Sequence, residues 1–184
     1  MPTPVAHALC GYVCHQISTR RGERWQIGRI LGLIVVANLA DLDYLPGAFI
    51  NQPNSFHHGM THSLTFAVLF GLLAGAVGYV WKRQFWSVAI IMTVTYASHI
   101  LLDFFTMDTA EPFGEQLLWP FSSAYFLSPI ALFRDIDKGG TNATFFLRAF
   151  GLYNLKTVAL ECAIFAPIIF IIRYMKVKFN GKRQ

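Results

Sequence analysis

Three histidines lie within six residues of one another in the stretch SFHHGMTHS: His57, His58 and His62. Imidazole nitrogens are common protein ligands for divalent metal ions. Gly59 permits a tight turn between them, and Thr61 or Ser63 can cap the apolar helix expected from Leu64. Histidine-rich loops also sense pH at surfaces, so this loop alone leaves both readings open.

A second stretch, YASHILLDFFT, places His99 four residues before Asp103. On a helix the two side chains project from the same face, one turn apart. Both can bind one divalent ion, or the carboxylate can orient a ligating imidazole. The alternative is a buried ion pair that only fixes the packing of the helix.

The stretch ANLADLDYLPG contributes Asp41 and Asp43. On a continuous helix these carboxylates would lie about 200° apart and could not face one site. Pro46 and Gly47 indicate that the helix ends here, so an irregular last turn could direct both inward. Otherwise one is a ligand and the other caps the helix or faces water.

Composition indicates a membrane protein, because 54% of the residues are hydrophobic and only 14% are charged. Apolar segments are expected at 27–45, 64–81, 85–105 and 155–172, with a shorter helix at 4–19. We therefore expect an all-α integral membrane bundle of about five helices, forming a single domain over 1–184. The region 106–154 is expected to be an outer loop with re-entrant or interfacial pieces, whose acids are solvated.

Basic residues predict the orientation of the bundle, because short cytoplasmic loops collect Lys and Arg. Most of the 15 basic residues fall where five alternating segments share one side: Arg20, Arg21, Arg24, Arg29, Lys82, Arg83, Arg173, Lys176, Lys178, Lys182 and Arg183. This places the N-terminus outside and the C-terminus in the cytoplasm. Membrane lipids are the expected partners. The sequence has no basic face interleaved with aromatic residues, so nucleic acid is not an expected partner.

The same topology brings the candidate ligands to one membrane face. Residue His7 of the first segment lies near that face, together with the acids, the histidine loop and the His99 pair, whereas His15 falls near the opposite end. Glu161 in the last segment either points into the same cavity or pairs with Lys156. A rival site for a soft metal would use His7, Cys10 and Cys14.

In chain order, TPVAHAL, LADLD, HHGMTHS, SHILLDFFT and LLWPF resemble the YdjM-type membrane-bound, metal-dependent hydrolase family, over residues 4–122. The resemblance implies a bacterial inner-membrane protein and a more remote similarity to zinc-dependent phospholipase C. The positions that match the family's polar residues are His7, Asp41, Asp43, His57, His62, His99 and Asp103. The chain departs from the pattern at His58, where the family usually has Arg, and at Ala40, where it usually has Pro.

Together these observations predict a metal-dependent hydrolase at the outer face of the inner membrane. A metal-activated water would cleave a phosphoester or ester of an amphiphilic or lipid-linked substrate. The expected ligands of a divalent ion, Zn with Mn or Fe as alternatives, are His7, Asp43, His57, His62, His99 and Asp103. Whichever of Asp41 and Asp43 is not a ligand is the candidate general base, and His58, Thr61 and Glu161 are candidate accessory groups. The alternatives are a metal-binding transporter or sensor, and a non-catalytic structural membrane protein.

Overall fold

The computed structural model describes residues 1–19, 27–109, 111–139 and 141–180. The α-helices of these residues are α1 (Pro4–Ser18), α2 (Ile27–Ala37), α3 (Tyr44–Phe49), α4 (Leu64–Val80), α5 (Phe85–Phe104), α6 (Asn142–Ala149) and α7 (Leu152–Asn180). Short 3-10 turns follow α2 and α3: η1 (Ala40–Asp43), η2 (Pro53–Phe56) and η3 (Met60–His62). The described ranges contain isolated β-bridges but no strand. The predicted all-α class is confirmed.

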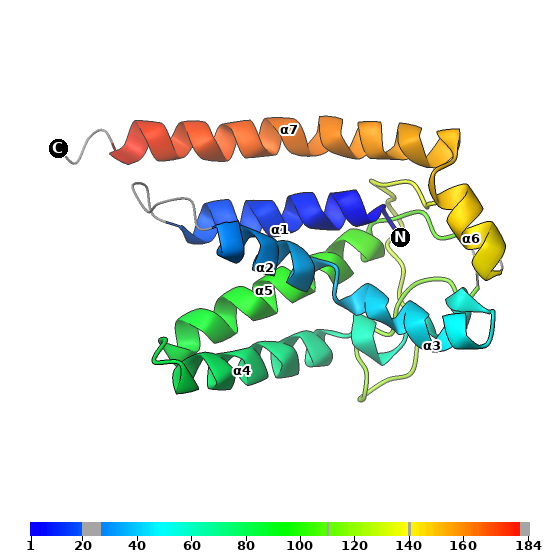
Figure 1. Cartoon of the computed structure of the whole chain (residues 1–184), viewed down its shortest axis with the longest axis horizontal. Helices are drawn as coiled ribbons and strands as arrows, with labels where there is room; N and C mark the ends of the chain where they lie inside the picture. The colour runs from blue at the N-terminus through cyan, green and yellow to red at the C-terminus, as the bar shows by residue number, and fades with distance from the viewer. Residues whose placement is uncertain (20–26, 110, 140, 181–184) are drawn as a thin grey trace.

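Helix α1 lies inside the bundle, in contact with α2, α5 and α7, while α4 packs along α5 (Figure 1). Thr3 caps α1 by accepting a hydrogen bond from the Val5 amide at 3.3 Å. On its inner face Gly11 approaches α2 so closely that an added Cβ would lie 2.7 Å from the Leu33 carbonyl oxygen. The N-terminal half of α1 lies beside the last turns of α5, where the His7 ring stacks on that of His99.

Small residues also join α4 to α5. Gly71 and Gly75 lie one turn apart on the buried face of α4, and a Cβ on Gly71 would come within 2.7 Å of the Ala89 carbonyl oxygen. Small residues one turn apart let two apolar helices approach closely where no hydrophobic effect drives them together. This close pairing fixes where the C-terminal end of α5 lies.

The helix expected over 27–45 is broken. It ends at Ala37, and the α2 segment meets the Ala40–Phe49 segment at an angle of 49°. Pro46 and Gly47 lie within α3 rather than after a helix end. Pro46 is tolerated there because it occupies the first turn, where its missing N–H has no intrahelical partner to lose.

Two described helices, α5 and α7, are long and apolar enough to cross a membrane, and the bent α2–α3 pair could supply a third. Helix α4 is apolar but only 17 residues long, and α1 has 15. The described helices thus account for fewer full spans than the five crossings expected from the sequence. Many large apolar side chains are exposed on α4, α5 and α7, as a membrane environment requires.

The helix ends that carry basic residues used to predict the orientation lie together at one end of the bundle. The C-terminal end of α1, the N-terminal end of α2, the α4–α5 turn and the C-terminal end of α7 all lie at this end, opposite α3 and α6 (Figure 1). Arg29 lies in the first turn of α2, and Lys82 follows α4. The other residues used to predict orientation at 20–26 and 181–184, namely Arg20, Arg21, Arg24, Lys182 and Arg183, lie outside the described residues.

Candidate metal centre

Four separate pieces of chain meet at the end of the bundle opposite the basic helix ends. Helix α1 supplies His7, the η1 turn Asp41 and Asp43, the loop of η2 and η3 its three histidines, and the last turns of α5 His99 and Asp103. All five of these histidines are buried, as are Asp43 and Asp103, whereas Asp41 is partly exposed. The structure therefore brings together the residues that the sequence placed on one membrane face.

The centre of the cluster holds two imidazoles and two carboxylates. One ligand atom from each of Asp41, His62, His99 and Asp103 lies within 4.8 Å of the others. His99 Nε2 is 3.1 Å from Asp103 Oδ2, 3.4 Å from Asp41 Oδ1 and 3.2 Å from His62 Nε2. This spacing brings nitrogen and oxygen donors around a single point.

Hydrogen bonds at the Nδ1 atoms determine the orientation of the two central imidazoles, those of His62 and His99. His99 Nδ1 lies 2.8 Å from the Ala37 carbonyl oxygen, which can only accept, so Nδ1 carries the proton. His62 Nδ1 lies 3.1 Å from the Asp43 carboxylate. Both Nε2 atoms consequently point at one another beside two carboxylates. A proton or a cation must lie between such acceptors, and imidazoles held in this way are typical of metal ligands.

Asp43 holds the histidine loop. Its Oδ1 accepts a hydrogen bond from His57 Nδ1 at 2.9 Å, and its Oδ2 accepts one from the Thr61 hydroxyl, also at 2.9 Å. Together with the contact to His62, these bonds occupy both carboxylate oxygens. Asp43 therefore orients two imidazoles, and it also belongs to the possible ligand group of Asp41, Asp43 and His57.

His7 reaches the centre from the side. Its ring stacks on His99 with centroids 3.8 Å apart, and its Nε2 lies 3.4 Å from Asp103 Oδ1. Neither ring nitrogen has a hydrogen-bond partner although the side chain is fully buried. A buried imidazole without a partner is costly, so His7 is available to a bound ion or its water.

The loop histidines extend the cluster. His57, His58 and His62 form a second group with ligand atoms within 4.8 Å, and Asp41, Asp43 and His57 form a third. The turn is made by His58, which adopts a left-handed φ of 65°, and not by Gly59 as the sequence suggested. The three groups share residues and make one continuous set of ligands.

Unpaired buried atoms show that a metal fits these residues. The cluster members that lack a hydrogen bond include Asp41 Oδ1, His57 Nε2, His58 Nε2 and both Asp103 oxygens. Each such atom costs about 1–3 kcal/mol if left unpaired, and a divalent ion would satisfy several at once. Imidazole and carboxylate donors suit Zn, Mn or Fe. Among the described residues, Cys10 and Cys14 belong to none of these groups, which argues against the soft-metal site.

Burial sets the protonation of the loop histidines. Desolvation, aided by the neighbouring His58, His62 and Lys138, lowers the pKa of His57 well below its usual value. Desolvation likewise lowers the pKa of His58 to about 4. For His62 burial acts in the same direction, but hydrogen bonds to Asp103 and Asp43 outweigh it and raise its pKa to about 9. His57 and His58 are therefore neutral at pH 7, the form in which imidazole binds metals.

Two predicted accessory groups are engaged in hydrogen bonds. Thr61 belongs to the cluster through its bond to Asp43. Glu161 is bound to the start of α1, where its carboxylate accepts hydrogen bonds from the Thr3 amide at 2.7 Å and from the Thr3 hydroxyl. The carboxylate of Glu161 thus ties α7 to α1 and is occupied there.

Three acids of the region 106–154 were missed because acids in an irregular segment are usually solvated. Glu115 is 1% exposed with both oxygens unpaired, and burial raises its pKa well above the usual value. Asp135, 3% exposed, accepts hydrogen bonds from the Met1 amino group at 2.9 Å and the Thr109 hydroxyl at 2.5 Å. Asp108 Oδ2 lies 3.6 Å from His58 Nδ1. No local sequence signal distinguished these acids from the exposed Asp137.

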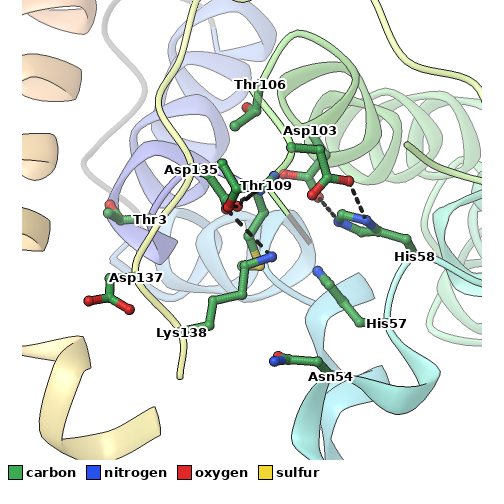
Figure 2. Close-up of polar contacts among 12 residues, drawn as sticks. Thr3, Asn54, His57, His58, Asp103, Thr106, Thr109, Asp135, Asp137 and Lys138 are labelled. Carbon is green, nitrogen blue, oxygen red and sulfur yellow. Dashed lines mark hydrogen bonds and ion pairs between the residues drawn. The ribbon is translucent and has the colours of Figure 1, made fainter. Parts of the chain in front are cut away.

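A polar cavity of about 420 Å³ lies beside the histidine loop. Its lining includes Asn54, Thr109, Asp135, Lys138 and Tyr153. Figure 2 shows the Lys138 ammonium group between Asp135, 3.5 Å away, and the ring of His57. The cavity lining thus contains one cation, Lys138, and two acids, Asp135 and Asp137.

Comparison with known proteins shows the family of the chain. The family described as "YdjM inner membrane protein" matches residues 1–179. The chain belongs to the YdjM inner membrane protein family. Within the curated proteins it is 35% identical over 139 residues to "Inner membrane protein YbcI" of Escherichia coli (strain K12), which covers 70% of this chain and 73% of that protein. No solved structure matches the chain. YdjM membership places the protein in the inner membrane, as expected.

Proposed function

We propose that this YdjM-family protein is a metal-dependent hydrolase whose divalent ion is held by Asp41, His62, His99 and Asp103. The observation that carries the proposal is the pair of imidazole Nε2 atoms 3.2 Å apart, both facing the Asp103 carboxylate. A purely structural ion pair would need only one such imidazole. His7 and the loop histidines provide further donors for the ion, a second ion or the reacting water.

The chemistry follows from the donor set. A divalent ion held by these residues with one position open would bring the pKa of a bound water to about 7 and would polarise an ester or phosphoryl oxygen. Asp41 belongs to the central ligand group, and Asp43 holds His57 and His62 in their ligating orientation. The role of general base, which the sequence assigned to one of these two acids, stays a prediction.

The surroundings of the cluster support an amphiphilic substrate. The polar cavity beside the histidine loop places Lys138, Asp135 and Asn54 where they can hydrogen-bond a polar headgroup. The cluster itself lies at the end of helices that are apolar enough for a membrane. We propose a phosphoester or ester of a lipid-like molecule, cleaved at the outer face of the inner membrane.

The experiment that tests the function begins with metal content. Protein purified without chelators is analysed by inductively coupled plasma mass spectrometry, as wild type, His62→Ala and His99→Ala, with Glu161→Gln as the control for a buried group outside the cluster. We expect stoichiometric Zn, Mn or Fe in the wild type and control and its loss in both histidine variants. The metal-loaded wild type should then hydrolyse 4-nitrophenyl phosphodiesters or esters.

Two results would count against the proposal. If the folded wild type contains no metal, the proposed ion is refuted, and the histidines are packing or pH-sensing groups. Stoichiometric metal without turnover of esters or phosphoesters would support the metal site but refute the hydrolase activity. That result would favour a metal transporter or sensor.

A further inference from the structure

An apolar groove of about 600 Å³ reaches Asp43. Its lining residues are Leu39, Leu42, Asp43, Pro46, Phe56, Gly59, Met60, Thr61, Phe66, Phe70 and Tyr96. Asp43 is the one acid among them, and its Oδ2 accepts a hydrogen bond from the Thr61 hydroxyl. The groove is therefore lined in part by the group that orients the candidate ligands His57 and His62.

The walls of the groove are well ordered by packing. The ring of Tyr96 lies 5.7 Å from that of Phe66 and 5.2 Å from that of Phe70, and its hydroxyl donates a hydrogen bond to the Thr61 carbonyl oxygen at 3.0 Å. Aromatic rings at these separations attract one another. Helices α4 and α5 thus provide a firm apolar wall next to the η3 turn.

The opposite rim is exposed and apolar. Leu42 is 54% exposed, Phe56 53% and Met60 51%. These side chains belong to the η1, η2 and η3 turns, and clustered exposed apolar side chains mark a surface that binds an apolar partner. The groove consequently has an apolar rim that a hydrocarbon chain can cover.

The groove and the polar cavity meet at the η2 turn. Asn54 of this turn lines the polar cavity, whereas Phe56 lines the groove. His57 follows directly and is bound to Asp43. A molecule with one polar and one apolar end could occupy both spaces with its junction at the histidine–aspartate cluster.

We propose that this groove binds the hydrocarbon chain of the substrate, which enters sideways from the bilayer. The chain lies along Phe66, Phe70 and Tyr96, and the bond to be cleaved lies at the end of the groove marked by Asp43 and Thr61. The inference rests on the proposed function, which it refines by giving the substrate a single long alkyl or isoprenyl chain. Annular lipid that merely covers the groove is the competing occupant.

The test uses a non-hydrolysable probe, dodecylphosphonate with a photoreactive diazirine in the chain, so that it needs no turnover. Metal-loaded protein in amphipol is labelled, and the modified residues are mapped by mass spectrometry. The variants are Leu42→Trp, which fills the rim of the groove, and Leu69→Trp. Leu69 is a matched control because it is 55% exposed on α4 and does not line the groove.

We expect labelling of the α4 and α5 segments that contain Phe66, Phe70 and Tyr96, competed by unlabelled dodecylphosphonate. Leu42→Trp should lose this labelling, while Leu69→Trp should retain it. Because Leu42 adjoins Asp41 and Asp43, Phe70→Trp serves as a second blocking variant well removed in sequence from the ligands. Its labelling should be lost with metal content unchanged.

The proposed binding of a hydrocarbon chain in the groove would be refuted by labelling that is spread evenly over exposed side chains of α4 and α7. Labelling that is unaffected by both blocking variants would refute it as well. That failure is distinct from failure of the hydrolase, which appears as absent metal or absent turnover. Specific groove labelling in a protein without turnover would establish a lipid-binding site and refute the enzyme alone.

Discussion

At the scale of single residues, one carboxylate has an indirect role. Asp43 accepts hydrogen bonds from His57 and Thr61 and contacts His62, so its two oxygens serve the neighbours of the proposed ion. Carboxylates in this position fix the tautomer and the direction of a ligating imidazole. We therefore propose that Asp43 is a positioning residue, whereas Asp41 belongs to the central group.

We predict that Asp43→Asn weakens metal binding by about 10- to 100-fold without abolishing it. The amide can still accept from one partner but no longer stabilises a polarised imidazole. Titration with zinc in competition with a chromophoric chelator measures the change. Asp137→Asn, an exposed acid paired with Arg148, should leave the affinity at the wild-type value.

Complete loss of metal in Asp43→Asn would show that Asp43 is itself a ligand. An unchanged affinity would show that His57 and His62 keep their orientation without it.

At the scale of elements, the position of the ligands depends on how closely helices approach. His99 and Asp103 lie at the end of α5, and α5 is placed by the glycine face of α4. At Gly71 an added Cβ would lie 1.9 Å from the Thr93 hydroxyl and 2.7 Å from the Ala89 carbonyl oxygen. The second contact is with backbone, so it cannot be relieved by a rotamer change.

Gly71→Ala is expected to destabilise the protein by about 1–3 kcal/mol, the usual cost of overpacking a tight interface. Gly32→Ala is the matched control, since nothing lies within 4 Å of the Cβ that it adds. This control should be neutral or gain up to about 1 kcal/mol from helix propensity. Thermal unfolding in detergent, followed by circular dichroism, measures both. Equal stability of the two variants would show that α4 and α5 can separate without cost.

At the scale of the whole molecule, the bundle has two chemically different ends. Described basic residues follow or begin helices at one end, and the histidine–aspartate cluster lies at the other (Figure 1). Because Lys and Arg favour cytoplasmic loops, we propose that the cluster faces the outside of the inner membrane. A site there meets headgroups and chains of the outer leaflet, as the cavity and the groove would require.

In a protein whose cysteines Cys10, Cys14 and Cys162 are replaced by serine, this orientation predicts opposite labelling at two new cysteines. Phe121→Cys, at a position 88% exposed in the outer region, should react with a membrane-impermeant maleimide in intact spheroplasts. Lys82→Cys, just after α4, should react only after the membrane is opened. The reverse pattern would place the site in the cytoplasm and contradict the proposed topology.

The sequence by itself determined the helical class, the membrane location and the residue types of the candidate site. These depend on local properties: runs of apolar residues, a four-residue helical spacing of His99 and Asp103, and histidines beside a helix cap.

Only the tertiary structure decided which acids face the cluster and where a substrate could lie. The break after Ala37, the left-handed turn at His58 and the burial of Glu115 and Asp135 each depend on partners distant in the chain. The groove has the same origin, because α4, α5 and the η turns form it jointly. Local pattern specifies which faces of a helix are apolar, whereas contacts between distant segments decide which of those faces are covered and which are left open.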